Sequence, residues 1–118
     1  MAANTVLIYQ TSDARKPFEE WLDALKDRQA RAKIRTRIGR LALGNPGDYR
    51  ALDEGIYELR IDWGPAYRVY FARTGNVIIL LLCGGDKPTQ QKDIDNAKAY
   101  LKDYKAGAAQ RGLRVVPD

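Results

Sequence analysis

The sequence contains no histidine and a single cysteine among its 118 residues. This limits the catalytic groups, disulfides and metal ligands that the protein can use. Without histidine, the commonest general acid–base residue is missing, so any catalysis must use Lys, Arg, Tyr, Asp or Glu. The lone cysteine, Cys83, excludes an internal disulfide and is typical of a reducing compartment. The nitrogen and sulfur ligands of an ordinary zinc site are also lacking, and we expect neither a metal nor another cofactor.

Long hydrophobic runs are absent as well. The longest, Val77–Cys83, is far too short to span a bilayer. The first ten residues, MAANTVLIYQ, have neither the charged leader nor the apolar stretch of a signal peptide. We therefore expect a cytoplasmic protein with no membrane attachment.

What the sequence does contain is enough apolar material for one core. Hydrophobic residues make up 45% of the chain, which is typical of a folded domain and not of a disordered chain. We expect a single domain over residues 1–105 and a mobile tail over residues 106–118, where no clear periodicity is present. Lys and Arg number 20 against 15 Asp and Glu, and this excess permits an anionic partner.

The spacing of hydrophobic residues predicts seven elements in the order β-α-α-β-β-β-α. A first strand covers residues 5–11, and a helix begins at Pro17. A second helix follows Asp27 as its N-cap and ends at Gly44. Three strands and a last helix are predicted at 56–62, 67–73, 77–83 and from residue 90. This is an α+β fold, with a mostly antiparallel four-stranded sheet and the helices packed on one face.

Two arginines, Arg60 and Arg68, alternate with the apolar residues of neighbouring predicted strands. If the apolar residues face the helices, both arginines lie on an open face of the sheet, with Lys87 at its rim. An alternative is that the arginines merely pair with Glu58 and Asp62, as exposed charges on adjacent strands often do. The residues expected beside the cations, as acid–base groups or for base stacking, are Glu58, Tyr70 and Asp86.

The second predicted helix is strongly basic. Between Lys26 and Arg40 the only acidic residue is Asp27. Such a segment binds phosphates or an acidic partner in many proteins, although it is also compatible with an ordinary solvated face. The candidates for contact with RNA or the ribosome are Arg28, Arg31, Lys33, Arg35 and Arg37.

Four stretches of the chain, taken in order, resemble addiction-module killer proteins, which are HigB-like toxins of the RelE/ParE superfamily. The stretches are PFEEWLDALKD, ARAKIRTRIGRLALGNPGD, GIYELRIDWGPAYRVYF and LLLCGGDKPTQQKDIDNAKAY. The resemblance covers roughly residues 5–105. It implies the toxin of a type II toxin–antitoxin system, silenced by a helix-turn-helix antitoxin. Active relatives cleave messenger RNA within the translating ribosome.

Position by position, the resemblance makes Arg68 the arginine that stabilises the scissile phosphate, Arg60 the basic residue of the preceding strand, and Lys87 the basic residue after the last strand. The function it implies is a metal-independent, ribosome-dependent mRNA endonuclease. The general acid and base stay open, because the histidines of some HigB toxins and the C-terminal tyrosine of RelE have no clear match. The alternatives are a ParE-like toxin, which inhibits DNA gyrase without chemistry, and a nucleic-acid-binding accessory module.

Overall fold

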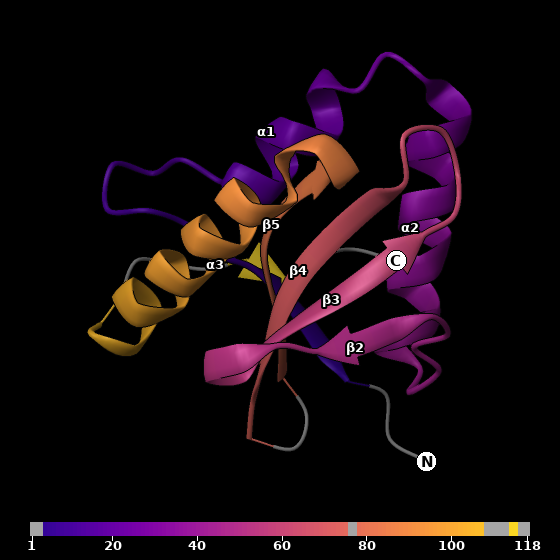
Figure 1. Ribbon diagram of the computed structural model, residues 1–118. Coiled ribbons are helices and arrows are strands. Elements are labelled where there is room, and N and C mark those ends of the chain that lie inside the picture. Colours follow the sequence, from indigo (N-terminus) through magenta and orange to yellow (C-terminus); the bar gives the residue numbers. More distant parts are fainter. Residues whose placement is uncertain (1–3, 76–77, 108–113, 116–118) are drawn as a thin grey trace.

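The computed structural model describes residues 4–75, 78–107 and 114–115, which form an α+β fold that contains the seven predicted elements in the predicted order, together with two further strands (Figure 1). The predicted fold class is therefore confirmed. The helices are α1 (Pro17–Ala24), α2 (Arg28–Ala42) and α3 (Gln90–Lys105), with 3-10 turns η1 (Asp53–Gly55) and η2 (Lys87–Thr89). The strands are β1 (Thr5–Ile8), β2 (Tyr49–Ala51), β3 (Ile56–Ile61), β4 (Tyr67–Thr74), β5 (Ile78–Asp86) and β6 (Arg114–Val115).

The strands form one sheet in the order β2-β3-β4-β5-β1-β6. Neighbouring strands are antiparallel except for β1 and β5, which run parallel. The prediction of four strands missed β2, whose three side chains are all exposed, so no apolar alternation marks it. It also missed the two-residue β6. The predicted mobile tail, residues 106–118, falls largely outside the described residues.

The helices cover both faces of the sheet, and the prediction that they share one face is wrong. Helices α1 and α2 pack on one face and α3 on the other. The reason lies in β5, where Ile79 and Leu81 face α1 and α2 while Leu80 and Leu82 face α3. A strand that is apolar on both sides needs a cover on each. Among the described residues, no helix is long and apolar enough to cross a membrane.

The local signals that bound the helices act as predicted. Pro17 occupies the first turn of α1. The Asp27 carboxylate accepts hydrogen bonds from the backbone N–H groups of Gln29 and Ala30 and so caps α2. Gly44 follows the end of α2 with a positive φ of 86°, a conformation that favours glycine.

A glycine pair, Gly84 and Gly85, lets helices approach β5 closely from both sides. A Cβ atom on Gly84 would lie 2.2 Å from the Trp21 ring of α1. A Cβ atom on Gly85 would lie 1.8 Å from the Asp93 carboxylate of α3. The two glycines therefore continue β5 rather than end it, and they allow α3 to begin close to the surface of the sheet.

Candidate functional site

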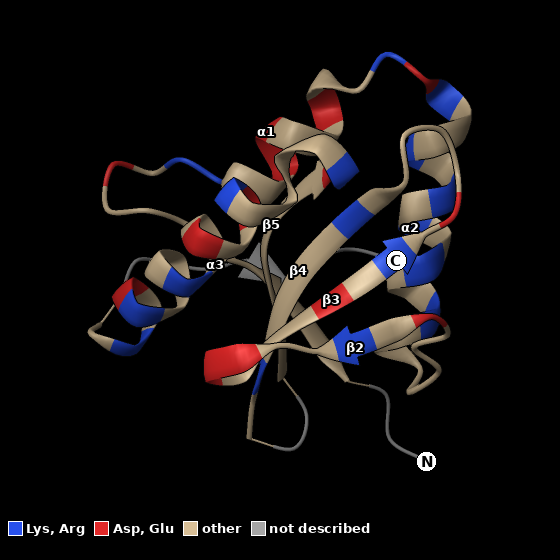
Figure 2. Ribbon diagram, viewed as in Figure 1, with Lys and Arg blue, Asp and Glu red and all other residues tan. Residues whose placement is uncertain are grey.

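Three arginines lie on neighbouring strands, on the face of the sheet that α3 covers only in part. Arg60 of β3 stands opposite Arg68 of β4, and Arg50 of β2 stands opposite Glu58 of β3. Residues paired in this way share one face of a sheet. Figure 2 shows basic residues on all three strands around an acidic residue on β3. The side chains of Arg50, Arg60 and Arg68 are 48%, 39% and 12% exposed.

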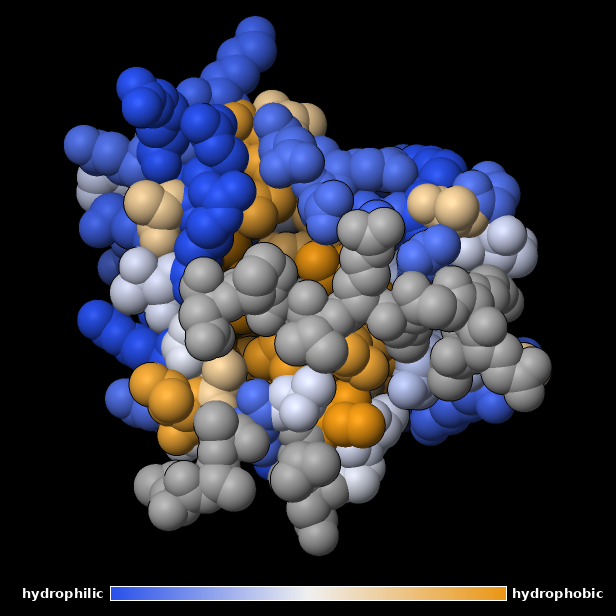
Figure 3. Space-filling view, turned by 180° about the vertical axis from the view of Figure 1, so that it is seen from behind, coloured by the Kyte–Doolittle hydropathy of each residue, from blue (hydrophilic) through white to orange (hydrophobic). Residues whose placement is uncertain are grey.

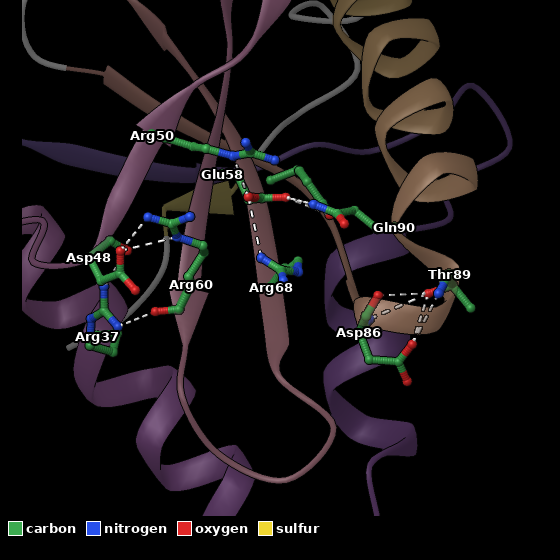
Figure 4. Close-up of polar contacts among 10 residues, drawn as sticks. Arg37, Asp48, Arg50, Glu58, Arg60, Arg68, Asp86, Thr89 and Gln90 are labelled. Atoms are coloured by element: carbon green, nitrogen blue, oxygen red, sulfur yellow. Dashed lines mark hydrogen bonds and ion pairs between the residues drawn. The ribbon is translucent and has the colours of Figure 1, made fainter.

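Glu58 is the centre of this cluster and is fully buried. Its Oε1 atom accepts hydrogen bonds from Arg50 Nε at 2.9 Å and from Arg68 Nη1 at 3.3 Å. Its Oε2 atom accepts from Tyr70 Oη at 3.1 Å and from Gln90 Nε2 at 2.8 Å (Figure 4). A buried carboxylate is stable only when donors replace its water, and here β2, β4 and α3 supply them.

These partners keep Glu58 ionised. Burial by itself would raise the pKa of Glu58, but hydrogen bonds from Gln90 and Arg50 and the charge of Arg68 outweigh it, so that the pKa lies below its ordinary value. An effective general base at neutral pH needs a raised pKa and access to the proton that it removes. The Glu58 carboxylate has neither and instead holds other groups in place.

Tyr70 is also fully buried, so the expectation that it lies on an open face is wrong. It belongs to the apolar cluster that α3 covers, together with Ala97 and Leu101. Burial, with the nearby negative charge of Glu58, raises the pKa of Tyr70 far above its usual range. The phenol therefore stays protonated at neutral pH, and because the ring is fully buried it cannot stack on a base.

Arg60 pairs with Asp48. This pair was predicted neither by the open-face interpretation nor by the alternative of pairing with Glu58 and Asp62. The Nη2 and Nε atoms of Arg60 lie 2.8 Å and 3.1 Å from Asp48 Oδ1. Both side chains are more than a third exposed, at 39% and 54%, so water and salt screen the pair. The Arg60 guanidinium is therefore held only loosely and is open to an incoming anion.

Arg68 is the most enclosed of the three arginines. The alternative prediction, in which the arginines pair with acidic residues of the strands, is correct for Arg68, because Arg68 pairs with Glu58. Its Nε atom is buried and has no hydrogen-bond partner among the described residues. Such a donor is uncommon in folded proteins. Arg68 is thus anchored through one nitrogen and keeps further N–H groups unused.

Asp86 is the last residue of β5, and Lys87 follows it directly. Lys87 is exposed, and its backbone N–H donates to the carbonyl of Pro65 in the β3–β4 turn at 3.4 Å. Because Arg68 stands opposite Gly85, Lys87 lies just beyond the arginines, at the end of the sheet. Asp86 instead caps η2, and its Oδ1 atom accepts from the N–H and hydroxyl groups of Thr89 at 3.3 Å and 3.1 Å.

Helix α2 lies against the other face of the sheet, and one of its predicted RNA contacts has a structural role. Arg37 donates hydrogen bonds to the carbonyls of Pro46 and Asp48, each at 2.9 Å, and to the carbonyl of Arg60. It therefore fastens the loop after α2 to strand β3. This places Asp48 beside Arg60.

The other predicted contacts on α2 differ in how free they are. Arg31 donates to a backbone carbonyl in the connection between α1 and α2. The Lys33 ammonium lies 4.4 Å from the centre of the Trp63 ring, a cation–π arrangement. Arg28 and Arg35 are exposed. Of the predicted contacts, Arg28, Lys33 and Arg35 thus contribute most to the basic surface of α2, to which the exposed Arg40 also belongs.

A separate groove of about 500 Å³ lies between β1, α1 and α2. Its lining is mainly apolar, and its polar side chains are Glu19, Asp23 and Arg35. Figure 3 shows hydrophobic side chains at the middle of this rear face, flanked by hydrophilic ones. The groove lacks the convergent polar groups of a reactive site. Within the described residues, no three acidic or cysteine side chains come together as metal ligands.

Sequence reasoning missed three residues of the site: Arg50, Asp48 and Gln90. Arg50 and Asp48 lie in or beside β2, which no hydrophobic pattern marks. Gln90 begins α3 and reaches the cluster because that helix crosses the sheet face. A weak signal for the strand that carries Arg50 was present, since the segment YRA directly follows the GNPGD turn, and a strand often begins after a turn.

The chain belongs to the Gp49-like family. A family model described as phage-derived protein Gp49-like (DUF891) matches residues 20–107, which include every site residue named above. A protein of Haemophilus influenzae (strain ATCC 51907 / DSM 11121 / KW20 / Rd), described as an uncharacterized protein, is 54% identical over 86 residues. The match covers 73% of this chain and 87% of that relative. Neither description names an activity.

Proposed function

We propose that this protein is the toxin of a type II toxin–antitoxin system and that it cleaves messenger RNA on the ribosome. The observation that carries the proposal is the placement of Arg60 and Arg68 side by side on one sheet face, with Lys87 at the end of that face. The resemblance of four sequence stretches to HigB-like toxins supports the same assignment. Membership of the Gp49-like family is compatible with it.

The proposed reaction uses the nucleophile that RNA itself carries. The 2′-oxygen forms a bond to phosphorus while the bond to the 5′-oxygen breaks, leaving a 2′,3′-cyclic phosphate and a 5′-hydroxyl. Arg60 and Arg68 stabilise the charge that grows on the phosphate oxygens, which is commonly the largest contribution in such sites. In this proposal Lys87 protonates the departing 5′-oxygen. Glu58 and Tyr70 are too deeply buried to accept the 2′-hydroxyl proton, which therefore passes to a water molecule.

Phosphate binding requires Arg60 to leave Asp48. This exchange requires little free energy, since an exposed ion pair contributes only about 0–1 kcal/mol to stability. Arg68 needs no such exchange, because its bond to Glu58 occupies one of its nitrogens. The two arginines thus differ in role: Arg68 is preorganised, and Arg60 closes onto the phosphate when RNA arrives.

The proposal includes partners in the cytoplasm. The ribosome orients the messenger RNA, which an open sheet cannot do alone. Exposed cations of α2, namely Arg28, Lys33 and Arg35, contact ribosomal RNA on the other side of the molecule. A helix-turn-helix antitoxin silences the toxin in its own cell.

Primer extension on messenger RNA after induction of the toxin in cells tests this function. Wild-type protein should cut within codons of translated messages, and Arg68→Ala should abolish the cuts. Arg73→Ala is the matched control, because Arg73 lies on the same strand but belongs to the opposite face, beside Tyr57 and Phe71. Arg73→Ala should cut like the wild type.

Two results would contradict the proposal. Intact messages together with double-strand DNA breaks would indicate the gyrase-inhibiting alternative. An Arg68→Ala protein that is folded and cuts as well as the wild type would remove Arg68 from the active site. Thermal unfolding of each purified variant shows whether a loss of cutting reflects a loss of fold.

A further inference from the structure

Arg50 stands on the edge strand β2, beside the two arginines of the proposed site. It lies opposite Glu58 in the β2–β3 register and is about half exposed. Strands in a sheet are about 4.8 Å apart, and Arg50 and Arg68 lie on either side of β3 and two residues apart along it, so their Cα atoms are about 12 Å from each other. Both side chains then turn toward β3, because both bind the same carboxylate.

One oxygen atom of Glu58, Oε1, fixes both guanidinium groups. Arg50 uses its Nε atom in this contact, and neither of its terminal nitrogens has a hydrogen-bond partner among the described residues, so both can bind another group. Arg68 uses Nη1, which leaves Nη2 without a hydrogen-bond partner among the described residues, whereas its Nε is buried and out of reach of a ligand. An arginine held in this way loses little further conformational freedom when its planar guanidinium binds a phosphate group.

The charges around Glu58 leave the face positive. Arg50, Arg60 and Arg68 carry three positive charges, whereas Glu58 and Asp48 carry two negative ones. Glu58 is fully buried and presents no surface to a ligand. An anion that approaches the sheet therefore meets guanidinium groups on three adjacent strands, which is a track suited to a chain of phosphates.

We infer that Arg50 is a third RNA-contacting arginine, which binds the phosphodiester next to the one held by Arg60 and Arg68. Glu58 is the positioning residue that aims Arg50 and Arg68 at the same RNA backbone. The choice of RNA rests on the proposed function, whereas the two-arginine clamp rests on the contacts of Glu58.

The test uses a fluorescent single-stranded RNA in which every ribose is 2′-O-methylated, so that it binds without being cut. Fluorescence anisotropy gives its affinity for the full-length protein at several salt concentrations. Arg50→Ala should weaken binding several-fold and reduce the slope of log K against log salt by about 0.7, the value for one phosphate contact to a single strand. Arg73→Ala, on the opposite face, should leave affinity and slope unchanged.

A second measurement separates positioning from folding. In ¹⁵N NMR spectra the Arg50 Nε–H proton should exchange slowly with water in the wild type, because it is bonded to Glu58. In Glu58→Gln it should exchange faster, and RNA affinity should fall although all guanidinium groups remain. If Glu58→Gln does not fold, the comparison of Arg50→Ala with Arg73→Ala still decides the inference.

The outcomes distinguish the inference from the proposed function. If the wild type cuts messages in cells but Arg50→Ala binds the methylated RNA with unchanged affinity and slope, the inference is overturned and the function stands. If binding depends on Arg50 but messages stay intact in cells, the function is overturned and the RNA clamp stands. If the wild type shows no salt-sensitive binding to this RNA, the inference is overturned.

Discussion

At the scale of single residues, Glu58 is the most constrained side chain of the site. Burying a carboxylate away from water is unfavourable, and removing one partner of a buried ion pair commonly lowers the free energy of unfolding by about 3–5 kcal/mol. Here the two oxygens accept bonds from two arginines, a tyrosine and a glutamine, so the charge is fully compensated. The same bonds fix the arginines that the proposed chemistry uses.

Glu58 should make stability depend on acidity. Its folded-state pKa lies below the ordinary value of 4.5, so its contribution is complete above pH 4.5 and is lost as the pH falls below that value. Glu58→Gln should cost about 1.5–3 kcal/mol at pH 7, the range for a hydrogen bond to a charged group. Urea unfolding of both proteins should show this difference shrinking below pH 4.5. A difference that is constant with pH would mean that folding does not favour the ionised form.

At the scale of elements, β5 organises the molecule because helices press on both of its faces. Trp21 of α1 lies over Gly84, and Asp93 of α3 lies over Gly85. Burial raises the pKa of Asp93, although a hydrogen bond from Thr89 opposes this effect. The contact of α3 with the sheet sets the position of Gln90 and hence of Glu58. Packing at these glycines is thus linked to the geometry of the arginine cluster.

Gly84→Ala should destabilise the fold. The new Cβ atom would meet the Trp21 ring at 2.2 Å, and forced overpacking of this kind costs about 1–3 kcal/mol. Gly39→Ala in α2 is the matched control, because a Cβ atom added at Gly39 would have no neighbour within 4 Å, and alanine should stabilise the helix by about 0.5–1 kcal/mol. Guanidinium unfolding of both variants measures the effects. If Gly84→Ala were as stable as the wild type, α1 would not pack on β5 as described.

At the scale of the whole molecule, positive charge lies on two sides. The arginine cluster is on the sheet face that α3 partly covers, and the basic α2 is on the other face (Figure 2). Positive charge is therefore present on both faces of the sheet (Figure 2). A partner that silences the protein would gain most by covering the arginine face with Asp or Glu, with apolar anchors for the remaining affinity.

Binding of the proposed antitoxin should be sensitive to salt through its rate of association. Charges at the rim of an interface steer the encounter and affect dissociation little. When purified partners are mixed, association should slow as salt rises, while dissociation should change only slightly. An association rate that does not change with salt would place the antitoxin away from the cationic face.

The sequence by itself determined the three helices, strands β1, β3, β4 and β5, and the shared face of Arg60 and Arg68. Alternation assigned Arg60 and Arg68 to one face, and capping residues such as Asp27 and Gly44 placed the limits of α2. These features are local, because helix caps and strand alternation act within a few residues of the chain. They can therefore be predicted from the sequence without knowledge of the tertiary structure.

Only the tertiary structure determined which helix covers the sheet face of Arg60 and Arg68 and which charged residues form ion pairs. Alternation cannot tell that α3 crosses the sheet and buries Tyr70 and Glu58. Nor can it tell that Asp48 and Arg50 arrive beside Arg60 and Glu58, since β2 carries no apolar pattern. Ion pairs and burial depend on segments distant in sequence, and their energies are set by the solvent that those segments exclude.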